Sequence, residues 1–329
     1  MTRRHLIVFV LFATSCASAS NPKLTQADAL IQRAIAHSDW RASGPLSVSG
    51  KVVLESINGS PTVLYKLLWK SPREWSDSIS APGYGELRVG LGDKLVIKRS
   101  MPSTPGIFLE MYSALNPQRI WYGISNRIAT RVQSRTIAGK QATCVSYAEN
   151  MGPNPTGKVA EFCADPATSD LLYASGGVGD VGYSNFTTIN GHAFPKKIKV
   201  VTDGHPAITI ALSAKPAESP APISAPAGAA VSVNCPAADF REPVLLRQQR
   251  PYYPGGALML REQGTSGYAV LITPEGRVQI ESLTVSAGRL LDDATGSALE
   301  KWHYFPATCD GKPIGRETVV DVHFEIRDH

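Results

Sequence analysis

The chain has 329 residues, and because domains usually contain about 100 to 200 residues, this length predicts about two of them. Hydrophobic residues make up 43% of the chain and charged residues 19%, a balance that excludes a disordered protein. The formal net charge of +5 arises from scattered residues and not from basic runs, which argues against a nucleic-acid partner.

Residues 1–19 are predicted to be a secretory signal peptide. Arg3 and Arg4 precede the apolar stretch Leu6 to Phe12, and small residues at 17–19 follow as a cleavage site. The apolar stretch is much shorter than the roughly 20 residues that a membrane-spanning helix needs, so cleavage and release into the periplasm are expected. An alternative is lipid anchoring at Cys16, because the segment that ends there is similar to a degraded bacterial lipobox.

The four cysteines outside this segment are predicted to form two disulfides. An even set of cysteines in a chain bound for an oxidising compartment favours disulfides. Cys144 and Cys163 lie on consecutive strand-like segments around the turn-forming residues 151–155, so a hairpin would bring them together. Cys235 and Cys309 then pair by elimination. Neither pair has the CxxC spacing of a zinc or redox site, and we expect no metal.

Residues 20–212 are predicted to form a β-rich N-terminal domain that begins with a helix. Leu24 to His37 has apolar residues at the three-and-four spacing of an amphipathic helix. Apolar residues then alternate in Leu46 to Leu54 and, after an Asn-Gly turn, in Val63 to Trp69. More strands are expected around residues 75–79, 85–91, 94–100, 140–149, 158–165, 171–176, 183–189 and 196–202, with 113–122 as helical or loop cover. This order predicts an α+β fold with a curved, half-barrel-like antiparallel sheet.

Residues 213–230 are predicted to be a linker. They are rich in proline and alanine and contain almost no large apolar side chain, so they cannot build a core. Such a composition favours an extended, semi-rigid spacer. We therefore place the domain boundary here, and residues 231–329 form the second domain.

The second domain is predicted to contain helix, strand, strand, helix and strand in that order. A short helix is expected at 257–261 and a hairpin at 267–272 and 278–285, joined by a tight turn. A second helix follows at 291–302, and Asp292 and Asp293 suit its N-terminal dipole. The final strand is expected at 318–326. Trp302 and Phe305, at the end of the second helix, are expected to pack in the core.

Several short motifs in this domain resemble the TonB C-terminal family over about residues 235–327. They are the Pro-x-Tyr-Pro motif at 251–254, the hairpin turn at Gly276, Ser286 and Gly288 before Leu291 and Asp292, and Trp302, Phe305 and Pro306 at the helix end. The resemblance implies a three-stranded antiparallel sheet packed against two helices. It also implies binding of the TonB-box segment of outer-membrane transporters by strand addition.

The resemblance assigns the partner-binding residues to one sheet edge and one motif. The residues that it implies are Thr318, Val320, Val322 and Phe324 on the last strand, and Arg250, Tyr253 and Pro254 at the start of the domain. An edge strand offers unpaired backbone groups to an extended peptide. Arg250 stands where the family often has a glutamine, and this departure bears on the choice of partner. A cleavable signal also differs from the retained anchor of TonB itself, so passive binding is expected in place of energy transduction.

The N-terminal helix followed by strands is similar to lipoprotein carriers of the LolA type, in which an open half-barrel holds acyl chains. Two functions follow. The leading prediction is a periplasmic TonB-like module that binds extended segments of outer-membrane or other envelope proteins by strand addition, with a link to outer-membrane transport. The alternative is a lipid or lipoprotein carrier whose cavity is lined by side chains such as Leu54, Leu67 and Trp69.

The sequence contains no HExxH or Gly-x-Ser-x-Gly motif, so we expect no catalytic residues, no enzyme activity and no cofactor.

Overall fold

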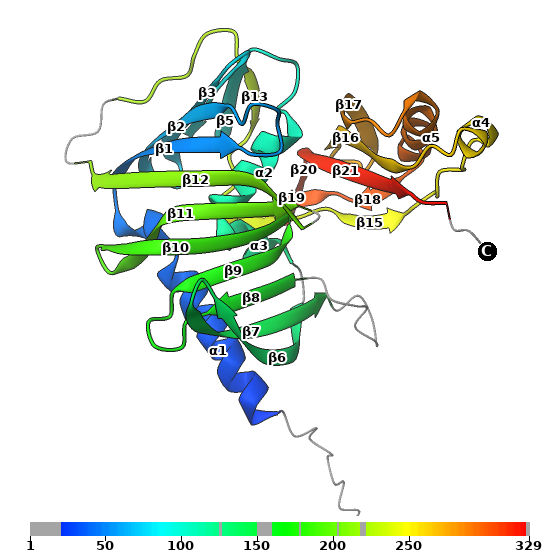
Figure 1. Ribbon diagram of the computed structural model, residues 1–329. Coiled ribbons are helices and arrows are strands. Elements are labelled where there is room, and N and C mark those ends of the chain that lie inside the picture. Colours follow the sequence, from blue (N-terminus) through cyan, green and yellow to red (C-terminus); the bar gives the residue numbers. More distant parts are fainter. Residues whose placement is uncertain are drawn as a thin grey trace, which may run out of the picture.

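The computed structural model of the chain describes residues 21–124, 127–149, 160–177, 179–202, 204–217 and 222–326. The predicted signal peptide with Cys16 and the predicted turn at 151–155 lie outside these residues. The described part combines one large antiparallel sheet with helices and three small C-terminal sheets (Figure 1). The predicted α+β class is confirmed.

The large sheet contains 13 strands in the order β13-β5-β4-β3-β2-β1-β12-β11-β10-β9-β8-β7-β6. The strands are β1 (Leu46–Leu54), β2 (Thr62–Ser71), β3 (Glu74–Ala81), β4 (Tyr84–Leu91), β5 (Lys94–Arg99), β6 (Arg127–Ile137), β7 (Lys140–Glu149), β8 (Ala160–Ala164), β9 (Leu171–Gly177), β10 (Gly179–Ile189), β11 (His192–Thr202), β12 (His205–Pro216) and β13 (Ala230–Val233). Strands β1 to β5 and β6 to β12 form two meanders, which join where β1 pairs with β12. The sheet is open, since β13 and β6 are its two ends.

Helices cover one face of this sheet and enclose the main core. They are α1 (Pro22–His37), the short 3₁₀ helix η1 (Trp40–Ser43), α2 (Gly106–Ala114) and α3 (Pro117–Gly123). The predicted apolar face of α1 is buried and contacts β6 to β9 (Figure 1). Ile31 of α1, Phe108 of α2 and Trp121 of α3 share one buried cluster with side chains of the strands. The core therefore lies in the concavity of the sheet.

Three strands of the large sheet, β6, β12 and β13, have no counterpart in the sequence prediction. Strand β6 is only half-buried and therefore lacks a clear alternation of apolar residues. The predicted linker boundary at residue 213 is wrong, because strand β12 extends through residues 213–216 and pairs there with β1. Strand β13 pairs with β5 although its side chains are exposed. Strand pairing uses the backbone, so a segment without large apolar side chains can still join a sheet.

The C-terminal region contains the predicted order of helix, strand, strand, helix and strand. Its elements are the 3₁₀ helix η2 (Ala237–Asp239), β14 (Phe240–Arg241), β15 (Val244–Arg247), α4 (Gly255–Met259), β16 (Gly264–Ile272), β17 (Val278–Val285), α5 (Arg289–Leu299), β18 (His303–Phe305), β19 (Ala307–Cys309), β20 (Lys312–Ile314) and β21 (Arg316–Phe324). The main sheet has the order β17-β16-β21, and its core includes Val270, Ile272, Leu299 and Trp302. The prediction for Trp302 is confirmed. The prediction for Phe305 is wrong, because this side chain is 53% exposed on the short strand β18.

Both predicted disulfides are present. Cys144 on β7 is directly opposite Cys163 on β8, and their Cα atoms are 3.9 Å apart. Cys235 follows β13 and is bonded to Cys309 on β19, with Cα atoms 5.8 Å apart. The second bond therefore connects the end of the large sheet to the C-terminal region.

Candidate functional sites

The first candidate site is the outer edge of β21. This strand pairs with β16 from Ile272↔Arg316 to Gly264↔Phe324. In the part of the chain that the structure describes, no strand pairs with its other side. The outer edge therefore has the geometry that strand addition requires.

The side chains predicted to bind a partner lie mostly on the inner face of this strand. Val320 and Val322 pack against the core below α5, and Phe324 is only 5% exposed. Thr318 is half-buried. Asp321 and His323 alternate with these residues and are exposed. A peptide at this edge would therefore meet the backbone of β21 together with Asp321 and His323, and the buried Phe324 ring would not be accessible to it.

The residues of the Pro-x-Tyr-Pro motif differ in accessibility. The Tyr253 ring packs edge-to-face against Phe324, with ring centroids 5.4 Å apart, and its hydroxyl donates a hydrogen bond to the Glu262 carbonyl. Pro254 is buried, whereas Arg250 is exposed. The structure thus brings Tyr253 and Phe324 together, in a position that supports the last strand from its inner side.

The start of β21 packs against the N-terminal region. Arg99 at the end of β5 donates hydrogen bonds to both carboxylate oxygens of Glu317, at 2.9 to 3.0 Å. A Cβ atom at Gly106 would lie 2.9 Å from Val319 Cγ2, so the backbone of α2 approaches this strand closely. The accessible part of the edge is therefore nearer the end of β21, around Asp321 and His323.

The second candidate site is a cavity of about 550 Å³. Strands β2 to β5, helices α2 and α3, residues 233–238 and Arg316 line it, so both parts of the chain contribute to its wall. Apolar and aromatic side chains form much of the surface, among them Leu67, Trp69, Trp75, Leu95, Leu109 and Tyr112. Leu67 and Trp69 were predicted to line such a cavity and do so. Leu54 was also predicted to line it, but it is 3% exposed in the core and does not reach the cavity.

One ion pair in the cavity wall is fully satisfied. Arg88 donates to both carboxylate oxygens of Asp77, at 2.9 and 2.5 Å, and lies 3.1 Å from the centroid of the Tyr112 ring. Burial raises the pKa of Asp77, and the charge of Arg88 opposes this shift. Because each group has its partner in the wall, this pair serves the structure of the cavity.

Two other arginines that line the cavity form no ion pair with any described carboxylate. Arg41 donates a hydrogen bond of 3.1 Å to the Leu115 carbonyl and lies 4.1 Å from the Trp40 ring centroid. Arg119 lies 3.9 Å from the Phe240 ring centroid, and its Nε is buried without a hydrogen-bond partner among the described residues. The sequence prediction missed both. An arginine within the mostly apolar segment 117–122 is a signal that could have indicated Arg119.

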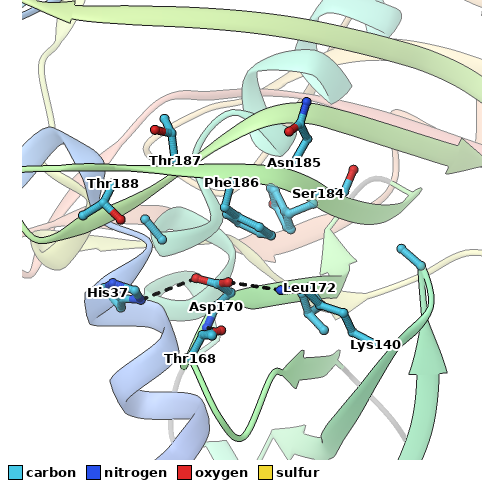
Figure 2. Close-up of a pocket in the computed structure, with 13 residues that line it drawn as sticks. His37, Lys140, Thr168, Asp170, Leu172, Ser184, Asn185, Phe186, Thr187 and Thr188 are labelled. Carbon is cyan, nitrogen blue, oxygen red and sulfur yellow. Dashed lines mark hydrogen bonds and ion pairs between the residues drawn. The ribbon is translucent and has the colours of Figure 1, made fainter.

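A further hollow of about 430 Å³ lies beside the end of α1 and strands β7, β9 and β10. Figure 2 shows Asp170 between His37 and Lys140, and His37 Nδ1 is 3.8 Å from one of its carboxylate oxygens. Lys140 Nζ is 3.5 Å from the other oxygen of Asp170 and 3.2 Å from Asp165. Asp170 and Lys140 thus have partners in the wall of the hollow, whereas Nδ1 of His37 is buried and forms no hydrogen bond with a described residue.

Comparison with known proteins places a TonB-type sequence at the end of the chain. Residues 249–326 match the family described as Gram-negative bacterial TonB protein C-terminal. The TonB C-terminal domain of Pseudomonas aeruginosa is similar, with 27% identity over 27% of this chain and 90% of that chain and a TM-score of 0.22. No curated protein matches the sequence.

Other solved structures are similar over a larger share of the chain. A LolA superfamily protein from Nitrosomonas europaea is 12% identical over 59% of this chain and 94% of that chain, with a TM-score of 0.34. The MucA/MucB complex of Pseudomonas aeruginosa includes a chain that is 15% identical over 70% of this chain and 72% of that chain, with a TM-score of 0.26. The family match of residues 249–326 confirms the TonB resemblance, and a LolA superfamily protein is among the similar solved structures. In the described residues, no helix is both long enough and apolar enough to cross a membrane.

Proposed function

We propose that this protein is a periplasmic binding protein, not an enzyme, and that β21 binds an extended segment of an outer-membrane or other envelope protein by strand addition. The observation that carries the proposal is the position of β21 at a sheet edge, with no described strand on its outer side. The TonB-type match of residues 249–326 supports it. A link to outer-membrane transport follows if the bound segment belongs to a transporter.

Recognition at this edge depends mainly on the backbone. An added strand forms main-chain hydrogen bonds with β21, and these supply most of the affinity. The exposed side chains of Asp321 and His323 lie beside the added strand and influence which sequence is chosen. Val320 and Val322 of β21 pack against the core of the C-terminal sheet and support the strand from its inner side.

The test uses proline, which lacks the N–H that an added strand needs. Neighbouring N–H groups of a strand point to opposite sides, so one of the variants Asp321→Pro and Val322→Pro loses an outward N–H and keeps the ladder to β16. Thermal unfolding identifies that variant. We expect it to bind a synthetic TonB-box peptide at least ten-fold more weakly than the native chain, measured by calorimetry.

The alanine variant at the same position is the matched control, because it keeps the backbone N–H. It should retain affinity within about three-fold, as expected when side chains contribute little. Amide exchange gives a second readout, since alternate amides near the end of β21 should gain protection when the peptide binds. Equal affinity in the native and both proline variants, or protection confined to β17, would contradict strand addition at β21.

The proposed location has its own test. The intact mass of the protein from periplasmic and membrane fractions shows which form exists. A soluble species that begins at Ser20 would support a free periplasmic protein. A species lipidated at Cys16 would support an anchored one, and an uncleaved membrane species would contradict release and reopen a tethered role.

The cavity supports a second candidate function, in which the large sheet holds the acyl chain of a lipid or lipoprotein. Its volume of about 550 Å³ lies in the range of about 300 to 1,000 Å³ that is typical of small-molecule sites. Its wall combines Leu67, Leu95 and Leu109 with the aromatic rings of Trp69 and Trp75. Such a surface favours a long apolar chain over a polar solute.

A further inference from the structure

The cavity wall carries more positive than negative side chains. Arg41, Lys70, Arg88, Arg119 and Arg316 line it, against the acidic side chains Asp39 and Asp77. Three of the cations have a carboxylate partner: Lys70 contacts Glu74 at 2.5 Å, Arg88 contacts Asp77 at 2.5 Å and Arg316 contacts Glu242 at 3.0 Å. Arg41 and Arg119 therefore form no ion pair with a carboxylate in the described part of the chain, although Asp39 acts on Arg41 and Glu242 on Arg119 from beyond ion-pair distance.

Arg119 forms fewer hydrogen bonds with the described residues than Arg41 does. Its guanidinium lies over the Phe240 ring, and Arg316 approaches the same ring at 5.3 Å. The charge of Glu242 acts on Arg119, but both carboxylate oxygens of Glu242 already accept hydrogen bonds from Arg316. Burial and the charge of Arg316 lower the pKa of Arg119 to about 9, and the charge of Glu242 opposes this shift. The environment thus disfavours the positive charge of Arg119, which Glu242 offsets only in part.

A buried charge without a partner is costly, because burial removes its hydration and returns no hydrogen bond. Arg41 avoids part of this cost through its hydrogen bond to Leu115 and its contact with Trp40. Nε of Arg119 has no such bond. A planar guanidinium in this state is suited to a carboxylate or a phosphate, which can accept two parallel hydrogen bonds.

We propose that the cavity binds an amphiphile with a long apolar chain and a single anionic group, and that Arg119 binds the anionic group. The apolar chain lies against Leu67, Trp69 and Leu109, and the carboxylate or phosphate accepts hydrogen bonds from the free N–H groups of Arg119. This inference rests on the second candidate function and adds the charge of the ligand. Because Arg316 belongs to β21, the anion also lies beside the C-terminal region.

The experiment measures binding to the mature chain by calorimetry with three ligands of equal chain length. They are tetradecanoate, lysophosphatidate with a tetradecanoyl chain, and the neutral 1-tetradecanol. We expect either anion to bind at least ten-fold more tightly than the alcohol, since one charge-assisted hydrogen bond contributes about that much. The tighter of the two anions identifies carboxylate or phosphate as the preferred group.

Variants of Arg119 then locate the anion. Arg119→Gln should weaken binding of the preferred anion at least ten-fold and leave the alcohol unchanged. Arg119→Lys keeps the charge without the planar fork and should give an intermediate affinity. Arg289→Gln is the matched control, because the Arg289 side chain is 93% exposed and lies outside the cavity wall, and its affinities should equal those of the native chain.

The outcomes separate this inference from the function on which it rests. Equal affinity of the native chain for anions and alcohol would overturn the anion site and leave the acyl-binding cavity standing. A loss of both anion and alcohol binding in Arg119→Gln would also overturn it, since the residue would then act by packing. If none of the three ligands binds the native chain, both the anion site and the acyl-binding function are refuted.

Discussion

The disulfide between Cys235 and Cys309 should stabilise the molecule more than the other disulfide does. It connects residues 74 positions apart, whereas Cys144 and Cys163 are 19 positions apart. The entropy lost by the unfolded chain increases with the length of the closed loop, which predicts a contribution of about 4 kcal/mol for the longer loop and about 3 kcal/mol for the shorter one. Replacing both cysteines of a pair by alanine should lower the free energy of unfolding by these amounts.

The longer bond also fixes a wall of the cavity. Cys235 lines the cavity and follows Asn234, whose side chain donates hydrogen bonds to the Pro72 and Gly92 carbonyls and accepts one from Trp75. Cutting the bond should therefore lower the affinity for a cavity ligand as well as the stability. Removal of the Cys144–Cys163 bond, which lies in a separate small cluster, should leave that affinity unchanged.

Urea unfolding followed by tryptophan fluorescence and by circular dichroism measures both variants. Coincident transitions are required before a single free energy is assigned. A loss below about 1 kcal/mol for the longer loop, or a clearly larger loss for the shorter one, would refute the reasoning from loop length. Unchanged ligand affinity in the Cys235/Cys309 variant would refute the role assigned to the cavity wall.

Three further predictions concern the C-terminal sheet. Burial and the charge of Glu317 raise the pKa of Glu281 to about 7, and the charge of Arg99 opposes this shift. The folded state therefore binds more protons than the unfolded state between about pH 4.5 and 7. The free energy of unfolding should fall as the pH rises through that window. In urea titrations, Glu281→Gln should remove this fall and raise the free energy of unfolding at pH 8 by about 1 kcal/mol, a value reduced to allow for the partial exposure of Glu281. A fall of equal size in the variant would contradict this prediction. A double-mutant cycle of Arg99→Gln and Glu317→Gln should give a coupling of about 1 to 2 kcal/mol, and additive effects would show that the pair does not join the two regions. Gly276 has φ +78°, and a Cβ there would lie 1.9 Å from the Tyr304 carbonyl oxygen. Gly276→Ala should therefore lower the free energy of unfolding by about 3 kcal/mol. A melting temperature equal to that of the native chain would disprove this.

Local patterns of the sequence were sufficient to predict most of the elements. The three-and-four spacing after Leu24 predicted α1, and alternation predicted the strand pair that begins at Leu46. The Cys144–Cys163 bond followed from two adjacent segments that pair as neighbours. In the C-terminal region, short motifs predicted the order of the elements and the edge strand. Each of these features depends on residues close together in the chain.

The sites themselves depended on contacts between distant parts of the chain. The pairing of β1 with β12 joins the two meanders, and nothing in either segment alone specifies the other. The cavity exists because residues 233–238 and Arg316 lie against the large sheet and form part of its wall. The alternation of apolar residues in 318–324 predicted a strand that includes Phe324. Only the tertiary structure shows that the Phe324 ring is buried against Tyr253. The sequence therefore determined the elements, because backbone and side-chain periodicity are local. The tertiary structure decided burial, the cavity and the lack of a described hydrogen-bond partner for Nε of Arg119, because solvent exclusion depends on which distant segments meet.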